Sequence, residues 1–474
     1  MPWTSIRVRI LCAIASCCVV FLCVTANAET LEHAWTLAYR NNPSLEAQRA
    51  ALRASDEQVS QALSHWRPSI DANGSVGKTH QYAPDLAPFE NPSFNDTTRT
   101  YGVQVTQPLF RGFRTKAETE AAEKQVLSGR AKLESAEQQL FLDTASAFLG
   151  VLRDEAALDL ERNHETVLED KLKETRARSK AGELTGTDVR QAESRLARAH
   201  VSRFQAESTL TQDRAAYLRL VGDEPGQLQP PALVLESPRM LADVFHCAET
   251  QNPDVVASQF AVEEAKAEIR LNEGSLLPEV DLVGNSTRSY GENITVPGRE
   301  DASQVLVQLT VPLYRSGTDY SKARAAQQTY RQRQDELDEA RHKAHETADN
   351  AWQALMTAQA ALDADKTEVD AAAQALKGVK EESKVGTRTT LDVLNAEQEL
   401  LDARIDEVKS QHDRDFAVLQ IKAAVGQLTA GNLKLPVEIY DPRRHYEDTR
   451  NQWIGFSKDD ARYKVTPVHS SVSQ

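Results

Sequence analysis

Two copies of one short pattern hold the side chains whose types and spacing suggest the most specific local chemistry. Thr185 and Asp188 are three residues apart, and so are Thr389 and Asp392. In a capping box, the threonine oxygen accepts a hydrogen bond from the third helical residue, whose acidic side chain bonds back to the threonine backbone. The carboxylate also complements the helix dipole. The pattern predicts that a helix begins at each copy.

A glycine lies three residues before each of these threonines, at Gly182 and Gly386. Glycine adopts positive φ without steric cost and commonly follows the last turn of a helix. Each copy therefore predicts a helix, a tight turn and a returning helix.

Other chemistry has little support in the sequence. The chain contains no HExxH, CxxC, GxSxG, P-loop or GxGxxG motif. His342 and His345 lie three apart on an expected helix, but no acidic or thiol partner stands at a fixed spacing, so we interpret them as surface residues. We expect no enzyme, cofactor or metal site. Cys247 is interpreted as a small packed residue.

The composition limits the class of protein. The 474 residues are 40% hydrophobic and 26% charged, with few glycines and prolines, which favours long polar helices over collagen, disorder or a helical membrane protein. The net charge of −15 argues against nucleic-acid binding.

The first 28 residues match a secretory signal peptide. Arg7 and Arg9 precede an apolar stretch over 10–24, and Ala26-Asn27-Ala28 is a cleavage site, so the mature chain is expected to start at Glu29. A signal anchor and a lipoprotein are the less favoured alternatives. Only Cys247 then remains, so no internal disulfide is expected.

The chain repeats itself after about 200 residues. Asn42-Pro43 returns as Asn252-Pro253, an offset of 210, whereas later motifs return at an offset of 204. The motifs at 204 include Pro108 with Pro312, Gly182 with Gly386, Asp188 with Asp392, and Val221-Gly222 with Val425-Gly426. A unit of this size indicates a duplicated half-domain.

The duplication predicts the domain organisation. We expect a signal peptide over 1–28, a first repeat over 29–222, a proline-rich linker over 223–238, a second repeat over 239–426, and a C-terminal segment over 427–474 whose end, 470–474, is disordered. Because the offset changes by six residues, each half should contain an exposed loop, near 83–98 and 291–301.

Alternating residues beside these loops predict strands. Tyr101, Val103 and Val105 alternate with smaller or polar residues, and similar alternation occurs in 70–76, 280–282 and 305–311. Scarce aromatic residues lie near the expected strand ends, where a membrane barrel has its girdles: Tyr82, Phe89, Tyr101, Phe110, Phe113, Tyr290 and Tyr314.

The remainder of each half is expected to be helical. Nearly proline-free runs cover about 115–180 and 320–384, long enough for helices of about 100 Å that pack as coiled coils. Shorter helices are expected over 187–221 and 390–426, and others precede the strands over 30–65 and 239–274.

Four strands cannot close a barrel alone. Strands in lipid must close, because an unpaired backbone group costs several kcal/mol, and closed barrels need about eight strands or more. Several chains would therefore share one barrel, and three would supply twelve strands. The alternative is a four-stranded sheet in a soluble helical protein.

These features together resemble the TolC family of outer-membrane channel proteins, over about residues 29–430. The most similar segments are Gln107-Pro108-Leu109-Phe110-Arg111-Gly112 and residues 385–394. The resemblance implies an α+β membrane protein: a homotrimer with a twelve-stranded β-barrel in outer-membrane lipid and a periplasmic α-barrel of long coiled helices. By analogy, part of the C-terminal segment joins the linker in a belt around that helical tube.

The resemblance also implies a function. The chain would be the passive duct of a tripartite efflux or type I secretion system, with a periplasmic adaptor and an inner-membrane ABC or RND transporter as partners. Its cargo would be drugs, toxic small molecules or unfolded proteins. The alternative is a structural coiled-coil tether or adhesin stalk without a pore.

In the family, the helical turns dock the adaptor. That role falls here on two sets of residues at the turns: Gly182, Glu183 and Leu184, and Gly386, Thr387 and Arg388.

Next to the turns lies the periplasmic gate. Arg388 matches an arginine that bonds a neighbouring coil, at positions matching Thr187 and Asp188. Asp392 matches a residue that lines the closed pore, and Asn395 stands where a second acidic residue is usual. A ring of Asp392 would favour cations, and the neutral Asn395 ring would weaken their binding. Ser383 replaces an aromatic residue found in some members. Helix capping alone is the other interpretation of Asp392.

Overall fold

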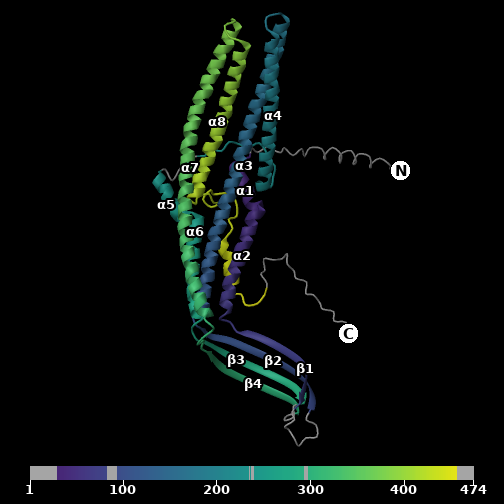
Figure 1. Ribbon diagram of the computed structural model, residues 1–474, viewed down its shortest axis with the longest axis vertical. Coiled ribbons are helices and arrows are strands. Elements are labelled where there is room, and N and C mark those ends of the chain that lie inside the picture. Colours follow the sequence, from purple (N-terminus) through teal and green to yellow (C-terminus); the bar gives the residue numbers. More distant parts are fainter. Residues whose placement is uncertain (1–28, 83–92, 234, 236–239, 293–296, 456–474) are drawn as a thin grey trace, which may run out of the picture.

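The computed structural model describes residues 29–82, 93–233, 235, 240–292 and 297–455. The signal peptide, the expected disordered end and the centres of both expected loops lie outside these ranges. In Figure 1 the helices form a long column, with two helical turns at one end and a sheet at the other. No helix of the described ranges combines the length and apolar character needed to cross a membrane.

Each half begins with two short helices. These are α1 (Leu31–Asn41) and α2 (Pro43–Ser64) in the first half, and α5 (Leu241–Gln251) and α6 (Pro253–Gly274) in the second. The prediction of single helices over 30–65 and 239–274 is wrong. Proline has no N–H and disfavours helical backbone in the residue before it, so Asn42 and Asn252 are extended and cap the next helix. Each also donates through Nδ2 to a backbone oxygen of a later helix, Leu220 or Ala424, at 3.1 Å.

The long helices match the expectation closely. Helices α3 (Arg114–Lys180) and α7 (Thr318–Lys384) have 67 residues each, or about 100 Å at 1.5 Å per residue. Their partners are α4 (Gly186–Val221) and α8 (Thr390–Ala424). A short helix, α9 (Pro442–Arg450), packs on α2. Each long helix and its partner form one hairpin of the column (Figure 1).

The sheet has four antiparallel strands in the order β1-β2-β3-β4. They are β1 (Ser69–Tyr82), β2 (Ser93–Arg111), β3 (Glu279–Glu292) and β4 (Pro297–Thr310). The strands are longer than predicted: residues 93–98 belong to β2, and 297–301 belong to β4, not to loops. Residues 95–98 and 298–301 are all glycine or polar, so the sequence there lacks the apolar alternation that marks the proximal parts of the strands.

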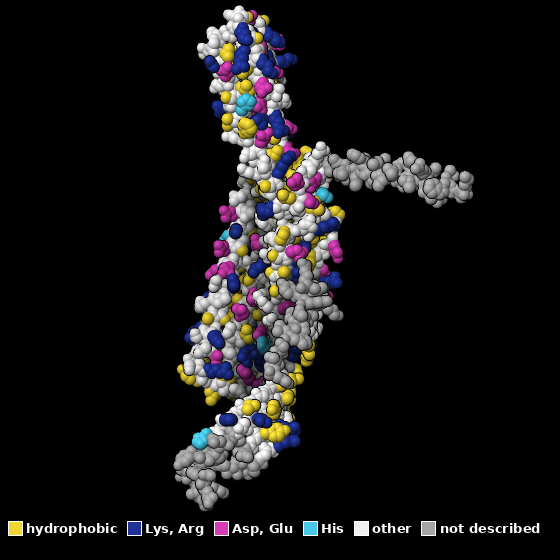
Figure 2. All heavy atoms as spheres, turned by 90° about the vertical axis from the view of Figure 1, so that its right-hand side faces the viewer, with side chains coloured by type: hydrophobic (Ala, Val, Ile, Leu, Met, Phe, Trp, Pro, Cys, Tyr) yellow, Lys and Arg dark blue, Asp and Glu magenta, His cyan; other side chains and the backbone are white. Residues whose placement is uncertain are grey.

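One face of the sheet is apolar and exposed. Ile70 pairs with Val105, Val105 with Gly284, and Gly284 with Val305, so these positions form a row on one face. The exposed fraction is 70% for Ile70 and 75% for Val305. Figure 2 shows hydrophobic and basic side chains together on the sheet. We call this the outward face.

The aromatic residues are placed only partly as predicted. Phe110 and Phe113 pack edge to face, 5.2 Å apart, where β2 meets α3, and exposed Tyr314 lies between β4 and α7. Tyr290 lies near the distal end of β3. Tyr101 is in the middle of β2, which corrects its expected place at a strand end. Phe89 and the side chain of Tyr82 are outside the described residues.

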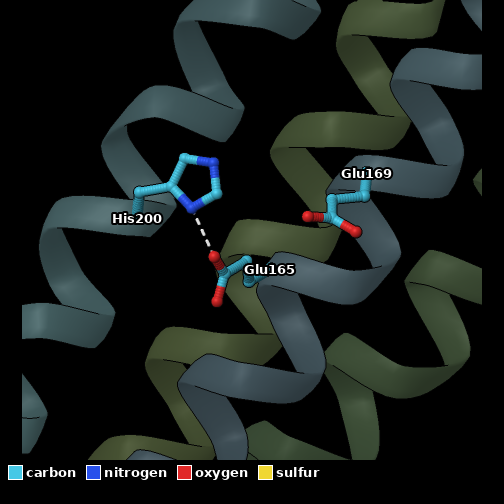
Figure 3. Close-up of side chains that lie close together, drawn as sticks. All are labelled: Glu165, Glu169 and His200. Atoms are coloured by element: carbon cyan, nitrogen blue, oxygen red, sulfur yellow. Dashed lines mark hydrogen bonds and ion pairs between the residues drawn. The ribbon is translucent and has the colours of Figure 1, made fainter.

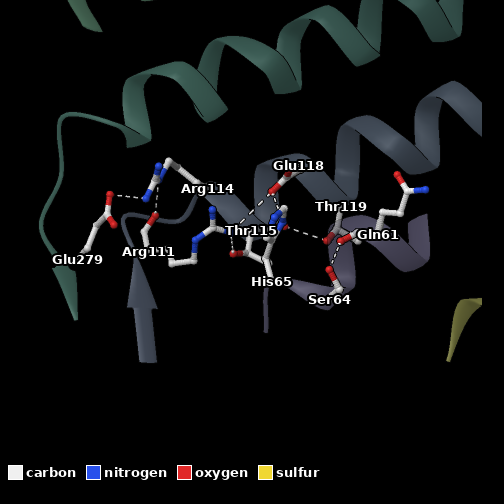
Figure 4. Close-up of polar contacts among 9 residues, drawn as sticks. All are labelled: Gln61, Ser64, His65, Arg111, Arg114, Thr115, Glu118, Thr119 and Glu279. Carbon is white, nitrogen blue, oxygen red and sulfur yellow. Dashed lines mark hydrogen bonds and ion pairs between the residues drawn. The ribbon is translucent and has the colours of Figure 1, made fainter. Parts of the chain in front are cut away.

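A crowded junction joins the sheet to the helices. A Cβ on Gly274 would lie 2.5 Å from the Gly112 carbonyl oxygen, so only glycine allows this approach of two backbones. Arg114 donates to the Arg111 carbonyl at 3.1 Å and pairs with Glu279 of β3 (Figure 4). His65 approaches Glu118 of α3 at 2.7 Å. These contacts fix the direction in which the sheet leaves the helices.

Two clusters form the core midway along the column. The first half contributes the large buried residues Tyr217, Phe141 and Phe148, and Trp35 donates to the Phe141 carbonyl at 2.9 Å. The second cluster belongs to the second half and consists largely of alanines of α7 and α8, together with Val244 and Val255. Leu228 and Leu233 of the linker, and Leu428 and Leu435 of the C-terminal segment, pack on the first cluster. The linker and the C-terminal segment thus pack on the same cluster, as expected if both belong to one belt around the helices.

Candidate functional site

The two helical turns, which we call the tips, have nearly the same geometry. Gly182 and Gly386 have φ of +80° and +85°. Glu183 N donates to the Arg178 carbonyl, and Thr387 N donates to the Glu382 carbonyl, both at 3.0 Å. These bonds end the long helices at glycine, as predicted.

Both capping boxes are confirmed. Thr389 N donates to Asp392 Oδ2 at 2.8 Å, and Asp392 N donates to Thr389 Oγ1 at 3.2 Å. The bonds at Thr185 and Asp188 are 2.9 and 3.3 Å. Hydrogen bonds from the Thr389 backbone and side chain hold the pKa of Asp392 below its ordinary value, and those from Thr185 do the same for Asp188. Both carboxylates are therefore ionised at neutral pH.

Each tip contains an arginine–glutamate ion pair, but the two pairs use different positions of the turn. Arg178 Nε lies 3.0 Å from Glu183 Oε2, and Arg388 Nε lies 2.8 Å from Glu382 Oε2. Within one chain, Arg388 therefore pairs with Glu382 and not with Thr187 or Asp188. Among the described residues, the terminal guanidinium nitrogens of Arg388 and Oδ1 of Asp188 have no hydrogen-bond partner.

Asn395 joins the two hairpins. Its Oδ1 accepts a hydrogen bond from Arg195 Nη2 of α4 at 2.8 Å. Just beside it, Leu394 packs with Leu168 and Ala199 of the first hairpin. Buried His164 of α3 lies close by: desolvation lowers its pKa, and Glu397 and Asp402 oppose that shift. The sequence did not predict Arg195, because no repeat or spacing relates it to Asn395.

The surfaces of the tips are open to solvent. Gly182, Glu183, Gly386, Thr387 and Arg388 are exposed, and Leu184 is half-buried. Val385 is 76% exposed, although it is an aliphatic residue at the end of a helix. It was not predicted as a site residue. Its signal is the repeat, since it replaces Ala181 at the corresponding position of the first tip.

One group of side chains has metal-ligand types. Glu165 and Glu169 of α3 and His200 of α4 place their ligand atoms within 4.8 Å of one another (Figure 3). Glu165 already contacts His200 through one oxygen, and Arg203 Nε approaches the other at 2.7 Å. A cation would have to displace this guanidinium, so the group is better explained as an ionic contact between α3 and α4.

The comparison with known families decides the identity. The model of the family described as "Outer membrane efflux protein" matches residues 35–223 and 244–427. The chain belongs to the outer membrane efflux protein family.

Individual relatives agree with this assignment. Outer membrane efflux protein BepC of Brucella suis biovar 1 is 32% identical over 437 residues, which cover 92% of this chain and 94% of BepC. The proteases secretion protein PrtF of Dickeya chrysanthemi is 27% identical and covers 85% and 89% of the two chains. The CmeC outer membrane channel of Campylobacter jejuni superposes with a TM-score of 0.77, at 14% identity, and 90% of each chain is covered.

These findings confirm the predicted family, fold class and main function. This outer membrane efflux protein is an α+β membrane protein with duplicated halves, long helices for a periplasmic α-barrel, and four strands per chain for a trimeric β-barrel. It is an outer-membrane duct for efflux or secretion, in a family of channels and not of enzymes. The tether or stalk alternative is not favoured.

Proposed function

We propose that three copies of this outer membrane efflux protein form one continuous passive duct, which an adaptor opens at the tips. The sheet carries this proposal: its edge strands, β1 and β4, have no further partner within the described chain, and its outward face is apolar. Open edges cannot lie in lipid. Pairing β4 of one chain with β1 of the next removes every edge and yields twelve strands from three chains.

The tips are the proposed gate. Arg195 and Asn395 link the two hairpins of one chain, whereas Arg388 uses only Nε for Glu382. Its terminal nitrogens are therefore available for Thr187 and Asp188 of a neighbouring coil. Each such exposed link is worth about 0.2–1 kcal/mol, which suits a lock that binding energy of a partner must undo.

Asp392 is the proposed charged ring at the neck. It is ionised and close to the tip, so three copies would raise the local negative potential and favour cations. Asn395 is neutral and accepts a hydrogen bond from Arg195, so it would add no negative charge. A cap and a pore ring are compatible, because the capping bonds use Oδ2 and leave Oδ1 without a partner among the described residues.

The tip residues, all exposed except the half-buried Leu184, are the proposed docking surface. Gly182, Glu183 and Leu184 form one contact, and Gly386, Thr387 and Arg388 the other, with Val385 as an apolar anchor beside the second. The partners are a periplasmic adaptor and, through it, an inner-membrane ABC or RND transporter.

We also propose cleavage of the signal peptide after Ala28. Glu29, the first mature residue, is held in place: its carboxylate accepts from Tyr217 Oη at 2.5 Å and from Gly226 N at 3.0 Å. Its backbone N donates to the Gln227 carbonyl at 2.7 Å. The mature N-terminus is thus anchored to the linker, which supports processing at this position.

For cargo, we propose drugs and other toxic small molecules, since the relative named as an efflux protein aligns over nearly the whole chain. Secretion of unfolded proteins is the second candidate, supported by the relatives named for protease secretion. Deletion of the gene, with complementation, tests both. Increased sensitivity to toxic compounds supports efflux, loss of one secreted protein supports secretion, and a strain that shows neither change contradicts the proposal.

A further inference from the structure

The distal part of the outward face is basic, unlike the apolar part below it. Arg99 of β2 pairs with Tyr290 of β3, which pairs with Arg299 of β4, so the three form one row across the sheet. In the preceding row, Tyr101 pairs with Arg288 and Arg288 with Asp301. Side chains alternate between faces along a strand, so both rows share the face of Val103 and Val105.

Charges of opposite sign are sorted between the two faces. Among the strand residues whose side chains the structure describes, the outward face holds four basic residues and one acidic residue: Lys78, Arg99, Arg288, Arg299 and Asp301. By the same count of described side chains, the opposite face holds the reverse, four acidic residues and one basic residue: Asp71, Glu279, Asp281, Glu300 and Arg111. We call Lys78, Arg99, Arg288 and Arg299 the distal basic patch.

Two residues of the patch form ion pairs within the chain, and the other two do not. Arg288 Nε and Nη2 lie 2.8 and 3.2 Å from the Asp301 carboxylate, and Arg299 contacts the same carboxylate. Asp301 therefore holds two guanidinium groups side by side. Lys78 and Arg99 are exposed and form no ion pair within the described part of the chain. Asp301 and the four residues of the distal basic patch together carry a net charge of +3 on each chain.

The length of β4 gives the position of the patch along the membrane normal. From Leu309, near the helices, to Arg299 there are ten residues of β4, or about 33 Å along a strand at about 3.3 Å per residue. With a barrel-strand tilt of about 45°, this is about 23 Å along the membrane normal, close to the roughly 25 Å apolar band of outer-membrane barrels. Because the helices lie on the periplasmic side, the patch is level with the headgroups of the outer leaflet.

We propose that the distal basic patch binds the phosphate groups of phosphorylated glycolipids in the outer leaflet. Guanidinium groups bind phosphate through two parallel hydrogen bonds, and lysine adds a compact charge. Tyr101 and Tyr290, beside the arginines, suit the boundary between acyl chains and headgroups. The proposal rests on the trimeric barrel described above.

Native mass spectrometry of the full-length mature trimer tests this binding. The trimer is incubated with equal amounts of bis-phosphorylated lipid A, its dephosphorylated form and phosphatidylglycerol. The wild type should retain phosphorylated lipid A in preference to both others. K78Q/R99Q removes the two free charges and leaves the Arg288–Asp301–Arg299 contacts intact. We expect its retention of that lipid to fall about fivefold or more.

A matched variant controls for charge. K173Q/K409Q removes two exposed lysines from the helices, each paired only with an aspartate of its own helix, and should retain lipid A like the wild type. Equal retention of all three lipids by the wild type, or unchanged retention by a trimeric K78Q/R99Q, overturns the proposal. If that variant does not assemble, the wild-type preference alone decides. A wild type that is not a conducting trimer instead refutes the duct itself.

Discussion

At the scale of single residues, we propose that the aspartates of the tips act both as helix caps and in the gate. Asp188 and Asp392 cap corresponding helices with nearly identical bonds, so their sequence pattern alone does not separate a cap from a pore residue. Their neighbours differ: Arg388 lies near Asp392, and the coulombic attraction contributes to its lowered pKa. The cation preference of variants at these two aspartates therefore separates capping from a charge at the neck.

Asp392→Asn should reduce cation preference, whereas Asp188→Asn should not. Both variants weaken a cap similarly, and Asp188→Asn also weakens the proposed link to Arg388, but only Asp392 is expected to add charge at the neck. The readout is the reversal potential of reconstituted trimers in a salt gradient. The pKa of Asp392 in the folded protein is below its ordinary 3.8. Its negative charge therefore persists as the pH falls from 8 to 5 and is lost only below pH 3.8. Wild-type preference should therefore stay constant over this range. Equal shifts in the two variants, or a preference that fades by pH 5, would contradict the ring.

At the scale of elements, glycine contacts decide how the sheet is attached to the helices. Gly112 and Gly274 bring β2 and α6 together with no room for a side chain, and Arg114 packs beside them. The ion pair of Arg114 with Glu279 then connects the start of α3 to β3. The direction of the sheet thus depends on close backbone contact between the two repeats.

Gly274→Ala should destabilise the trimer. Its Cβ would lie 2.5 Å from the Gly112 carbonyl oxygen and 2.7 Å from Arg114 Cγ, and overpacking of this kind costs about 1–3 kcal/mol. Gly378→Ala is the control, because the new methyl group has open space within α7 and improves helix propensity by about 0.5–1 kcal/mol. The temperature at which trimers dissociate on gels should fall for Gly274→Ala only. A similar temperature for both variants would show that the junction is not tightly packed.

The second tip carries a prediction about docking. Val385→Asp should remove an apolar anchor and place a charge at the contact, so resistance to a toxic compound should fall to that of the deletion strain. Val201→Asp is the matched control, since Val201 is 54% exposed on α4, away from the tips. Trimer levels are measured alongside. If Val385→Asp trimers are abundant and fully protective, Val385 is not part of the docking surface.

Much of the architecture was predictable because it repeats. Glycines and capping boxes located both tips, and the expected long helices begin within two residues of the observed ones. The Asn-Pro pairs do not by themselves predict the helix breaks at Asn42 and Asn252, because the apolar periodicity continues across them. The contact of Arg195 with Asn395 joins helices 200 residues apart, and no local pattern encodes such packing.

At the scale of the whole molecule, the sheet at one end and the tips at the other differ in the contacts that they need for assembly. The sheet needs other chains to pair its edges, which commits the protein to a closed trimer. The tips are linked within one chain by Arg195 and Asn395 and by a few apolar contacts. We therefore propose that the barrel stays closed against lipid, whereas the periplasmic end opens when the two hairpins separate.

Single-channel conductance in planar bilayers tests this account most directly. Purified wild-type trimers should insert and conduct at a low level, because the links at the tips hold the neck narrow. Arg195→Ala removes the link within a chain, and Arg388→Ser removes the proposed link between chains; each should raise conductance without dissociating the trimer. Lys409→Gln, at an exposed pair remote from the tips, should conduct like the wild type. The account predicts stepwise low conductance that rises in both gate variants. A chain that purifies as a non-conducting monomer, or trimers whose conductance is the same in all four proteins, would contradict it.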